Sequence, residues 1–474
     1  MPDSPPTSGV ASPDPAPPAP AQNTRQRLLR RAAEFAALLL VAAIAIAVAL
    51  QVTPMQTVNI AGQVITVGTT APSWSLSGPG EVDLFGQRLP TTLQFPGPIR
   101  PRLALSQITI NSELTNFVRG AGPAGAERVL GSRLADGWIH YFAWETAIAG
   151  LGALVLLGAV AGWRRLPRRT TIVLLAVGLL VTVAINAGAI FITASRAPAL
   201  LRQVNSLNEL VGSEPPAQVH VKGRPLPKVQ AVVMGDSTAA GLGLPVVPRS
   251  SPLGRVCGRS QDSYAQVLAA VNGWRVLNLA CSNATIARGL LGTQHRHGKR
   301  IPPQIATALR ARNASVVIVN VGANDLGWAA MVRYCAVAPR CDDKATTAYF
   351  QQQLATFSKD YLELLSQLAT LPGHPRVIIN QYYDPFGPEQ NCLHNAGLTP
   401  AKLAILTSRL TTLNAVLAKG ATEFGFLAPQ PDFTGHQLCT SQPYVQWFGD
   451  PAPFHPTALG QLAIALTDQA VLHG

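Results

Sequence analysis

Charged side chains are scarce in this sequence. Asp, Glu, Lys and Arg make up 13% of its 474 residues, whereas 47% of the residues are hydrophobic. That charged share is about half of what soluble domains carry, which disfavours a purely soluble protein and predicts membrane-spanning segments. Acidic residues are scarcer than basic ones, with 24 against 37, which gives a formal net charge of +13. Part of the basic excess lies in two short clusters beside apolar runs, which favours membrane topology over nucleic-acid binding.

Several motifs are absent, and each absence disfavours a class of protein. The sequence has no zinc-type cysteine spacing, no aromatic-rich basic segment typical of nucleic-acid binding, and no glycine-rich phosphate or dinucleotide motif. His295 and His297 lie close together, but no carboxylate or cysteine accompanies them, so a solvated basic loop is favoured over a metal site. We therefore expect no metal, no cofactor and no nucleic-acid partner.

Three apolar runs approach the roughly 20 residues that a helix needs to cross a bilayer. We predict membrane-spanning helices at 32–52, 143–163 and 171–193. A signal peptide is the alternative for the first run, since basic residues precede it. The long Pro-rich and Ala-rich tail before it, and the lack of a clear cleavage site, favour an uncleaved helix.

Two arginine clusters predict which side of the membrane each segment occupies. Four arginines lie within 25–31 and four more within the loop 164–170. Because short loops rich in arginine stay in the cytoplasm, a disordered tail at 1–31 and this loop are both predicted there. Three crossings then place everything from about 195 onward outside the membrane. The predicted location is the cell membrane, with several spans.

The extracytoplasmic part is predicted to contain two folded regions. Residues 53–142 show short β-type stretches broken by Gly and Pro, which predict a small β-rich domain of unread function. A linker at 194–228 follows. From 229 to 474, strand-like and helical stretches alternate, which predicts an α/β domain with a parallel sheet covered by helices on both faces.

All six cysteines lie in this last region. An even number, confined to a part of the chain predicted to lie outside, fits three disulfides, because oxidising compartments favour them. Six cysteines allow fifteen connectivities, so the sequence alone does not fix the pairing. Pairing in chain order is our expectation, and it gives the bridges Cys257–Cys281, Cys335–Cys341 and Cys392–Cys439.

Polar motifs follow the predicted strands of the α/β domain. The stretch "VVMGDSTAAGLG" places Ser237 after the first strand, "NLACSNAT" places Asn283 after the second, and "VGANDLGW" places Asn324 after the third. Near the end stands "DPAPFHPTALGQ", with Asp450 and His455. Because ligands bind beyond the carboxyl ends of strands in an open α/β sheet, these residues are expected to converge on one crevice.

Acyl transfer needs a hydroxyl nucleophile, a base and donors for the oxyanion. Ser237 is the expected nucleophile and His455 the expected base. The Asn324 side chain, with the backbone N–H groups of Ser237 and Asn283, is the expected set of oxyanion donors. A bare "GDS" tripeptide is common in ordinary strand-to-helix loops. The hypothesis therefore rests on the four quoted motifs taken together.

The blocks "GDS", "ACSNAT", "GAND" and "FHPTALGQ" resemble, in this order, those of the SGNH/GDSL hydrolase superfamily, over about 229–474. "VCGRSQDSY" and "NLACSNAT" also resemble the secreted, disulfide-bearing esterases and lipases of that family. The resemblance implies a flavodoxin-like three-layer domain and supports the chain-order disulfides. It also implies that Ser237 is the nucleophile, His455 the general base and Asn324 an oxyanion donor.

Two positions depart from the family pattern. The family usually has Gly where this chain has Asn283, which adds bulk and restricts φ. The family also places its triad Asp three residues before the His, where this chain has Ala452. Asp450 is the nearby carboxylate that is expected to orient His455. A main-chain carbonyl is the alternative, as in some disulfide-bearing members.

The sequence therefore predicts a membrane-anchored serine esterase or lipase with its catalytic domain outside the cell. Its substrate is expected to be an ester-bearing lipid or an acylated envelope glycan. Acyl transfer or deacetylation on envelope molecules, with the same Ser237 and His455, remains open. So does a non-catalytic binding module on the same fold, which the Asn283 and Ala452 departures favour slightly.

Overall fold

The computed structural model describes residues 24–60, 63–73, 75, 77–107, 123–201, 210–212, 223–247 and 251–473. Most of the predicted cytoplasmic tail and part of the predicted linker lie outside these residues. The chain divides into two compact units: Met1–Thr53 with Ala143–Gly188, and Pro54–Phe142 with Ala189–Gly474. The second unit carries all the predicted catalytic residues.

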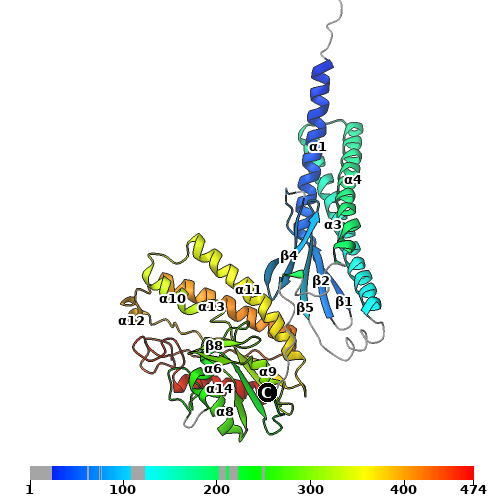
Figure 1. The fold of residues 1–474 in the computed structure, drawn as a ribbon. Coiled ribbons are helices and arrows are strands. Elements are labelled where there is room, and N and C mark those ends of the chain that lie inside the picture. Colours follow the sequence, from blue (N-terminus) through cyan, green and yellow to red (C-terminus); the bar gives the residue numbers. More distant parts are fainter. Residues whose placement is uncertain are drawn as a thin grey trace, which may run out of the picture. The chain divides into compact units, whose positions relative to one another are not determined.

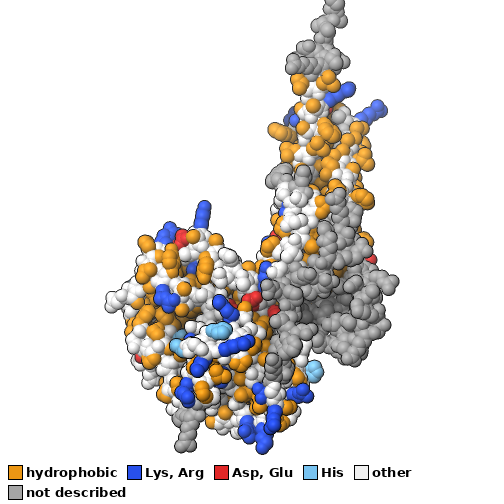
Figure 2. All heavy atoms as spheres, in the orientation of Figure 1, with side chains coloured by type: hydrophobic (Ala, Val, Ile, Leu, Met, Phe, Trp, Pro, Cys, Tyr) orange, Lys and Arg blue, Asp and Glu red, His pale blue; other side chains and the backbone are white. Residues whose placement is uncertain are grey.

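Three long helices contain the predicted membrane spans: α1 (Thr24–Val52), α3 (Pro123–Trp163) and α4 (Arg168–Leu201). Among the described residues, the stretches long and apolar enough to cross a membrane are Arg31–Val52, Arg133–Trp163 and Arg168–Thr193. Exposed hydrophobic side chains gather along this part of the molecule (Figure 2).

The helices are longer than the apolar runs alone predict. Helix α1 begins at Thr24, inside the expected tail, because the arginines there are good helix formers. Helix α3 begins at Pro123, well before the expected start at 143. Part of this extension packs on strand β2 (Gln63–Thr69), where Trp138 Nε1 donates to the Gly68 carbonyl at 3.0 Å.

The region predicted to be β-rich forms a five-stranded sheet with strand order β1-β2-β5-β3-β4. The other strands are β1 (Gln56–Ile60), β3 (Ser77–Leu84), β4 (Gln87–Pro96) and β5 (Pro101–Gln107). Burial alternates along β3 and β4, as expected when one face of a sheet packs and the other meets solvent. Phe85, in the turn between these two strands, packs edge-on against Tyr361 at 5.4 Å between ring centroids.

A four-stranded parallel sheet forms the centre of the C-terminal part, in the order β11-β10-β6-β7. Its strands are β6 (Ala231–Gly235), β7 (Val276–Asn278), β10 (Val316–Asn320) and β11 (Arg376–Ile379). Every residue of β6 and β10 is buried, which explains their unbroken apolar runs. Beside these strands, Ile378 and Leu427 form a single parallel bridge at the position of a fifth strand. Counted along the domain, this gives the flavodoxin-like order 2-1-3-4-5.

Helices cover both faces of this sheet (Figure 1). Helices α8 (Tyr264–Asn272) and α14 (Ala458–His473) pack against each other. Helices α11 (Lys344–Ala369) and α13 (Pro400–Glu423) form a second pair. The short helix α9 (Gln304–Ala308) adjoins β6. The predicted α/β layering is therefore present in the structure.

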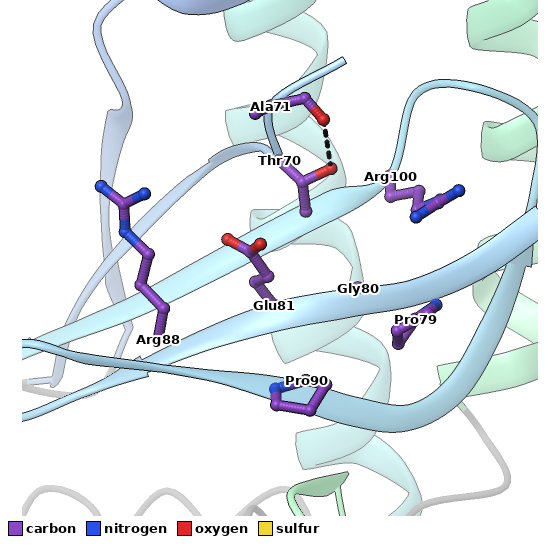
Figure 3. Close-up of a pocket in the computed structure, with 8 residues that line it drawn as sticks. All are labelled: Thr70, Ala71, Pro79, Gly80, Glu81, Arg88, Pro90 and Arg100. Carbon is purple, nitrogen blue, oxygen red and sulfur yellow. Dashed lines mark hydrogen bonds between the residues drawn. The ribbon is translucent and has the colours of Figure 1, made fainter. Parts of the chain in front are cut away.

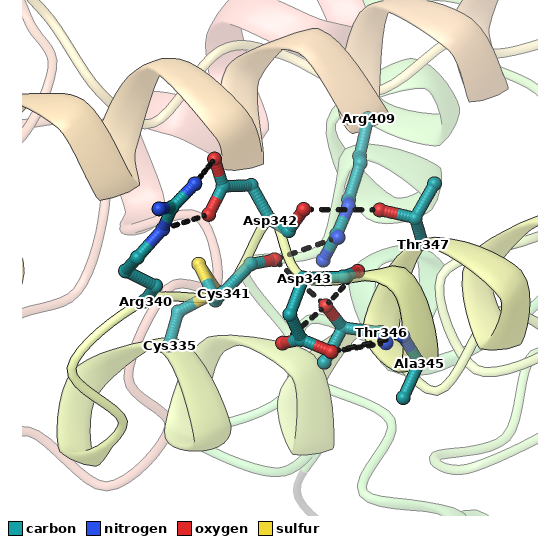
Figure 4. Close-up of polar contacts among 9 residues, drawn as sticks. All are labelled: Cys335, Arg340, Cys341, Asp342, Asp343, Ala345, Thr346, Thr347 and Arg409. Atoms are coloured by element: carbon teal, nitrogen blue, oxygen red, sulfur yellow. Dashed lines mark hydrogen bonds and ion pairs between the residues drawn. A yellow bond between two sulfur atoms is a disulfide. The ribbon is translucent and has the colours of Figure 1, made fainter.

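The six cysteines form three disulfides in the expected chain-order pairs: Cys257–Cys281, Cys335–Cys341 and Cys392–Cys439. The short Cys335–Cys341 loop leads directly into α11 (Figure 4). There Asp343 caps the helix by accepting from Ala345 N and Thr346 N at 2.9 and 3.0 Å. Arg409 of α13 donates to the Cys341 carbonyl at 2.8 Å, so this disulfide loop joins α11 to α13.

Candidate active site

Ser237 begins the four-residue helix α6 (Ser237–Ala240), directly beyond the carboxyl end of β6. The turn that presents it depends on Gly235, whose φ is +145° and where an added Cβ would lie 2.3 Å from the Asn320 carbonyl oxygen. Only glycine therefore fits here. Asp236 caps the turn, with its carboxylate accepting from Thr238 N at 2.9 Å. The chain thus leaves the strand, bends sharply and places a hydroxyl at the bend.

His455 lies in the loop before α14, and its Nε2 is 2.8 Å from Ser237 Oγ. The loop that carries it is held by Gln446, a buried side chain that the sequence did not single out. Gln446 donates to the carbonyls of Leu242 and Pro456 at 2.8 and 3.0 Å and accepts from Ala452 N at 3.2 Å. The structure therefore brings together the serine and histidine that lie 218 positions apart in the chain.

The group beside the other imidazole nitrogen is a main-chain carbonyl. His455 Nδ1 lies 3.1 Å from the Pro453 oxygen. Asp450, which the sequence analysis placed in this role, instead accepts from Trp447 N at 2.6 Å and so closes its own turn. The structure therefore places the Pro453 carbonyl, and not Asp450, beside the imidazole, which favours the carbonyl alternative. The reason is local: that exposed turn directs the carboxylate back along the chain and away from His455.

The three expected oxyanion donors follow three adjacent strands. In the described part of the chain, the backbone N–H groups of Ser237 and Asn283 have no hydrogen-bond acceptor. Asn324 donates one amide hydrogen to the Ala284 carbonyl at 3.0 Å, which leaves the other hydrogen free. Asn283 has a φ of +62°, the left-handed region that glycine favours and that asparagine tolerates. The backbone geometry expected of a glycine at this position is therefore kept.

Two consecutive tyrosines after β11 also contact the site. The Tyr382 hydroxyl donates to Asp236 Oδ2 at 2.6 Å and accepts from Ala323 N at 3.0 Å. The Tyr383 hydroxyl donates to the Phe454 carbonyl at 2.8 Å. Sequence reasoning missed both, because their hydroxyl groups bond residues that lie far away in the chain. The Asp384 carboxylate, which directly follows the two tyrosines, accepts from Phe386 N at 3.0 Å and closes a turn.

Burial sets the protonation of the groups at the site. Desolvation lowers the pKa of His455 below its ordinary value, against opposing effects of the Pro453 and Ala452 backbone, so the imidazole is neutral at pH 7. Desolvation raises the pKa of Asp236 to about 6. It also raises the pKa of Asp325, which accepts from Ile286 N at 2.9 Å beside Asn324, to about 7. A neutral imidazole hydrogen-bonded to a serine is suited to accept its proton.

A second hollow in the fold is lined by other residues than those of the candidate site. A cavity of about 190 Å³ lies in the five-stranded sheet, away from Ser237, and Glu81, Arg88 and Arg100 are among its lining residues (Figure 3). The guanidinium of Arg100 donates to the carbonyls of Ser75 and Ser77 at 3.1 and 3.0 Å. Among the described residues, no three His, Cys, Asp or Glu side chains gather as metal ligands would.

Comparison with known proteins finds matches for the C-terminal part of the chain. Residues 233–463 match the model of the GDSL-like Lipase/Acylhydrolase family. A lipase of Streptomyces rimosus is 28% identical over 252 residues, which cover 50% of this chain and 84% of that protein. Lipase 1 of Streptomyces coelicolor is 25% identical over 237 residues, which cover 48% of this chain and 81% of that protein.

Solved structures of similar sequence cover the same part of the chain. The crystal structure of the extracellular lipase of Streptomyces rimosus shares 24% identity and a TM-score of 0.39, and covers 51% of this chain and 99% of its own. The family model and the lipase relatives support the GDSL/SGNH lipase and acylhydrolase family for the C-terminal part. These matches support an SGNH-type ester hydrolase in that part of the protein.

Proposed function

We propose that this protein is a membrane-anchored serine esterase that hydrolyses acyl esters outside the cell through an acyl-enzyme on Ser237. The observation that carries this proposal is the 2.8 Å contact between Ser237 Oγ and His455 Nε2. It joins a nucleophile to a neutral base at the carboxyl end of a parallel sheet. The proposed substrate is an ester-bearing lipid, because the curated relatives are lipases.

The proposed mechanism has two half-reactions. Ser237 Oγ attacks the ester carbonyl while His455 Nε2 takes its proton, and the tetrahedral oxyanion accepts from Ser237 N, Asn283 N and Asn324 Nδ2. Collapse breaks the ester bond, and the imidazolium gives its proton to the leaving alcohol. Water then attacks the acyl-enzyme with His455 again as base, which releases the acid and restores Ser237. The Pro453 carbonyl accepts from Nδ1 and holds the imidazole in the tautomer that this sequence needs.

The membrane location is supported by independent features. Three helices have the length and composition of membrane spans, and two arginine clusters mark the same side as cytoplasmic. Three disulfides lie in the part that this topology places outside. We propose that the enzyme acts on esters at or near the membrane that anchors it.

The test uses the full-length protein in detergent. Initial rates with p-nitrophenyl esters from acetate to decanoate are measured for the wild type, for Ser237→Ala and for Ser366→Ala. Ser366 is a matched control, since its hydroxyl donates to the Leu362 carbonyl of its own helix at 2.8 Å. We expect Ser237→Ala to lose at least about 10³-fold in kcat/KM and the control to keep its activity. A folded wild type without turnover on any ester of the series would overturn the proposed function.

A further inference from the structure

The two tyrosines after β11 contact three of the four loops that carry the proposed catalytic groups. Tyr382 donates to Asp236, which directly precedes Ser237, and accepts from Ala323, which directly precedes Asn324. Tyr383 donates to the carbonyl of Phe454, which directly precedes His455. Each bond therefore lands one residue before a group that the mechanism uses.

We propose that Tyr382 and Tyr383 are positioning residues: Tyr382 holds the oxyanion loop against the nucleophile turn, and Tyr383 fixes the loop of His455. We call the two residues the tyrosine pair. Because the roles of Ser237, Asn324 and His455 are themselves proposed, this inference rests on the proposed function. It adds two residues whose hydroxyl groups bond the residues directly before Ser237, Asn324 and His455, and which act through those three.

The Tyr382 hydroxyl is well placed to join two loops. The ring is buried, and one oxygen serves as donor to Asp236 and acceptor from Ala323. Its own peptide is held in turn by Asn414 of α13, which accepts from Tyr382 N at 2.8 Å and donates to Tyr382 O at 2.7 Å. Burial beside Asp236 raises the pKa of Tyr382, so the phenol keeps the proton that it donates. Tyr382 is therefore held both at its hydroxyl and at its backbone.

Tyr383 is fixed by stacking on Phe433, with ring centroids 4.3 Å apart. The carbonyl that it binds belongs to Phe454, whose φ of +66° is unfavourable for a side chain of that size. A hydrogen bond to this carbonyl favours the strained conformation, which sets the direction in which the chain enters His455. Without it, the loop is free to relax and the imidazole loses its fixed distance to Ser237.

The first experiment compares Tyr382→Phe and Tyr383→Phe with Tyr361→Phe in the full-length protein. Tyr361 is a matched control, because it is a buried tyrosine whose hydroxyl donates to the Leu417 carbonyl at 2.9 Å, away from Ser237. We expect each variant of the pair to lower kcat roughly 10-fold with KM within about 2-fold, and the control to keep its kcat. Lower thermal stability with unchanged kcat in both variants would show a merely structural role and overturn the proposal.

The second experiment repeats both substitutions in an Asn324→Ala background. If Tyr382 acts through Asn324, Tyr382→Phe costs less than about 2-fold there, whereas Tyr383→Phe still costs its roughly 10-fold. Full additivity of Tyr382→Phe with Asn324→Ala would refute its part. Should Tyr382→Phe not fold, Asn414→Ala is used instead, because it removes the hydrogen bonds that hold the Tyr382 backbone. The loss of kcat caused by Asn414→Ala is likewise expected to vanish in the Asn324→Ala background.

Ser237→Ala, measured alongside, separates the two proposals. Full turnover by Ser237→Ala would refute the proposed mechanism and the tyrosine pair together. An inactive Ser237→Ala with unchanged Tyr382→Phe and Tyr383→Phe would refute the tyrosine pair alone.

Discussion

At the scale of single residues, main-chain groups hold positions that side chains often fill in comparable sites. The Pro453 oxygen lies 3.1 Å from His455 Nδ1, and within the described residues the N–H groups of Ser237 and Asn283 have no acceptor, which suits the roles proposed for them. Asn283 supplies a backbone N–H as a glycine would, since its φ of +62° lies in the left-handed region. A carbonyl cannot ionise, so in the proposed mechanism the orientation of the imidazole does not depend on the charge of a third side chain.

The first prediction concerns Asp450. Because its carboxylate closes the turn to Trp447 and does not contact the imidazole, Asp450→Asn is expected to keep kcat/KM within about 3-fold of the wild type. Loss of a true triad Asp costs about 10⁴-fold in kcat. Steady-state kinetics on one p-nitrophenyl ester decide between these values. A drop of several hundred-fold or more would return Asp450 to the catalytic machinery.

The second prediction is the pH dependence of activity. His455 must be neutral to accept the serine proton, and burial lowers its pKa below 6.5. Activity is therefore lost as the pH falls through that pKa and is complete above it, so kcat/KM is expected to reach half its maximum below pH 6.5. Asp236, with a pKa of about 6, titrates nearby. Asp236→Asn therefore serves as a control that should keep the same acid limb. A midpoint above pH 7 in both proteins would contradict this account.

At the scale of elements, the residues of the candidate site lie beyond the carboxyl ends of the strands of the parallel sheet. Ser237, Asn283, Asn324 and Tyr382 each follow a strand within five residues, on β6, β7, β10 and β11. This part was predictable from sequence, because unbroken apolar runs followed by polar motifs mark buried parallel strands and their ends. The roles of Tyr382, Tyr383 and Gln446 were not, because their partners lie far away in the chain. The turn that diverts Asp450 was not predictable either, because it depends on local backbone angles.

The third prediction concerns the disulfides. Cys281 directly precedes Ser282, whose N–H and hydroxyl both donate to the Cys257 carbonyl at 3.1 and 2.8 Å. Replacing Cys257 and Cys281 by Ala is therefore expected to lower both thermal stability and kcat, since the loop carrying Asn283 loses its anchor. Replacing Cys335 and Cys341 should lower stability with a smaller effect on kcat. Differential scanning fluorimetry and kinetics on both double variants test this, and equal effects on kcat would contradict it.

At the scale of the whole molecule, the chain couples apolar helices to a disulfide-bearing hydrolase. The apolar runs and arginine clusters indicated three spans from sequence alone, and three described helices have that length and composition. The full lengths of these three helices were not predictable. The part of α3 before residue 143 packs Trp138 and Tyr141 on β2, a tertiary contact that local hydropathy does not contain.

The fourth prediction concerns topology. With 1–31 and 164–170 in the cytoplasm and 229–474 outside, alkaline phosphatase fused after His473 should be active in a bacterial host, whereas a fusion within the arginine loop should be inactive. Green fluorescent protein fused at the same two positions is the reciprocal control. Fluorescence of the C-terminal fusion with an inactive phosphatase there would place the hydrolase in the cytoplasm and contradict the proposed location.

The most direct test of the central claim is to identify the residue that becomes covalently modified. Full-length protein in detergent is treated with a fluorophosphonate, digested and mapped by mass spectrometry, with His455→Ala as a second sample. The account predicts a single adduct on Ser237, in the peptide after Gly235, that forms at least about 10²-fold more slowly in His455→Ala. An adduct on another serine, or labelling of Ser237 at an unchanged rate without His455, would contradict the Ser237–His455 mechanism.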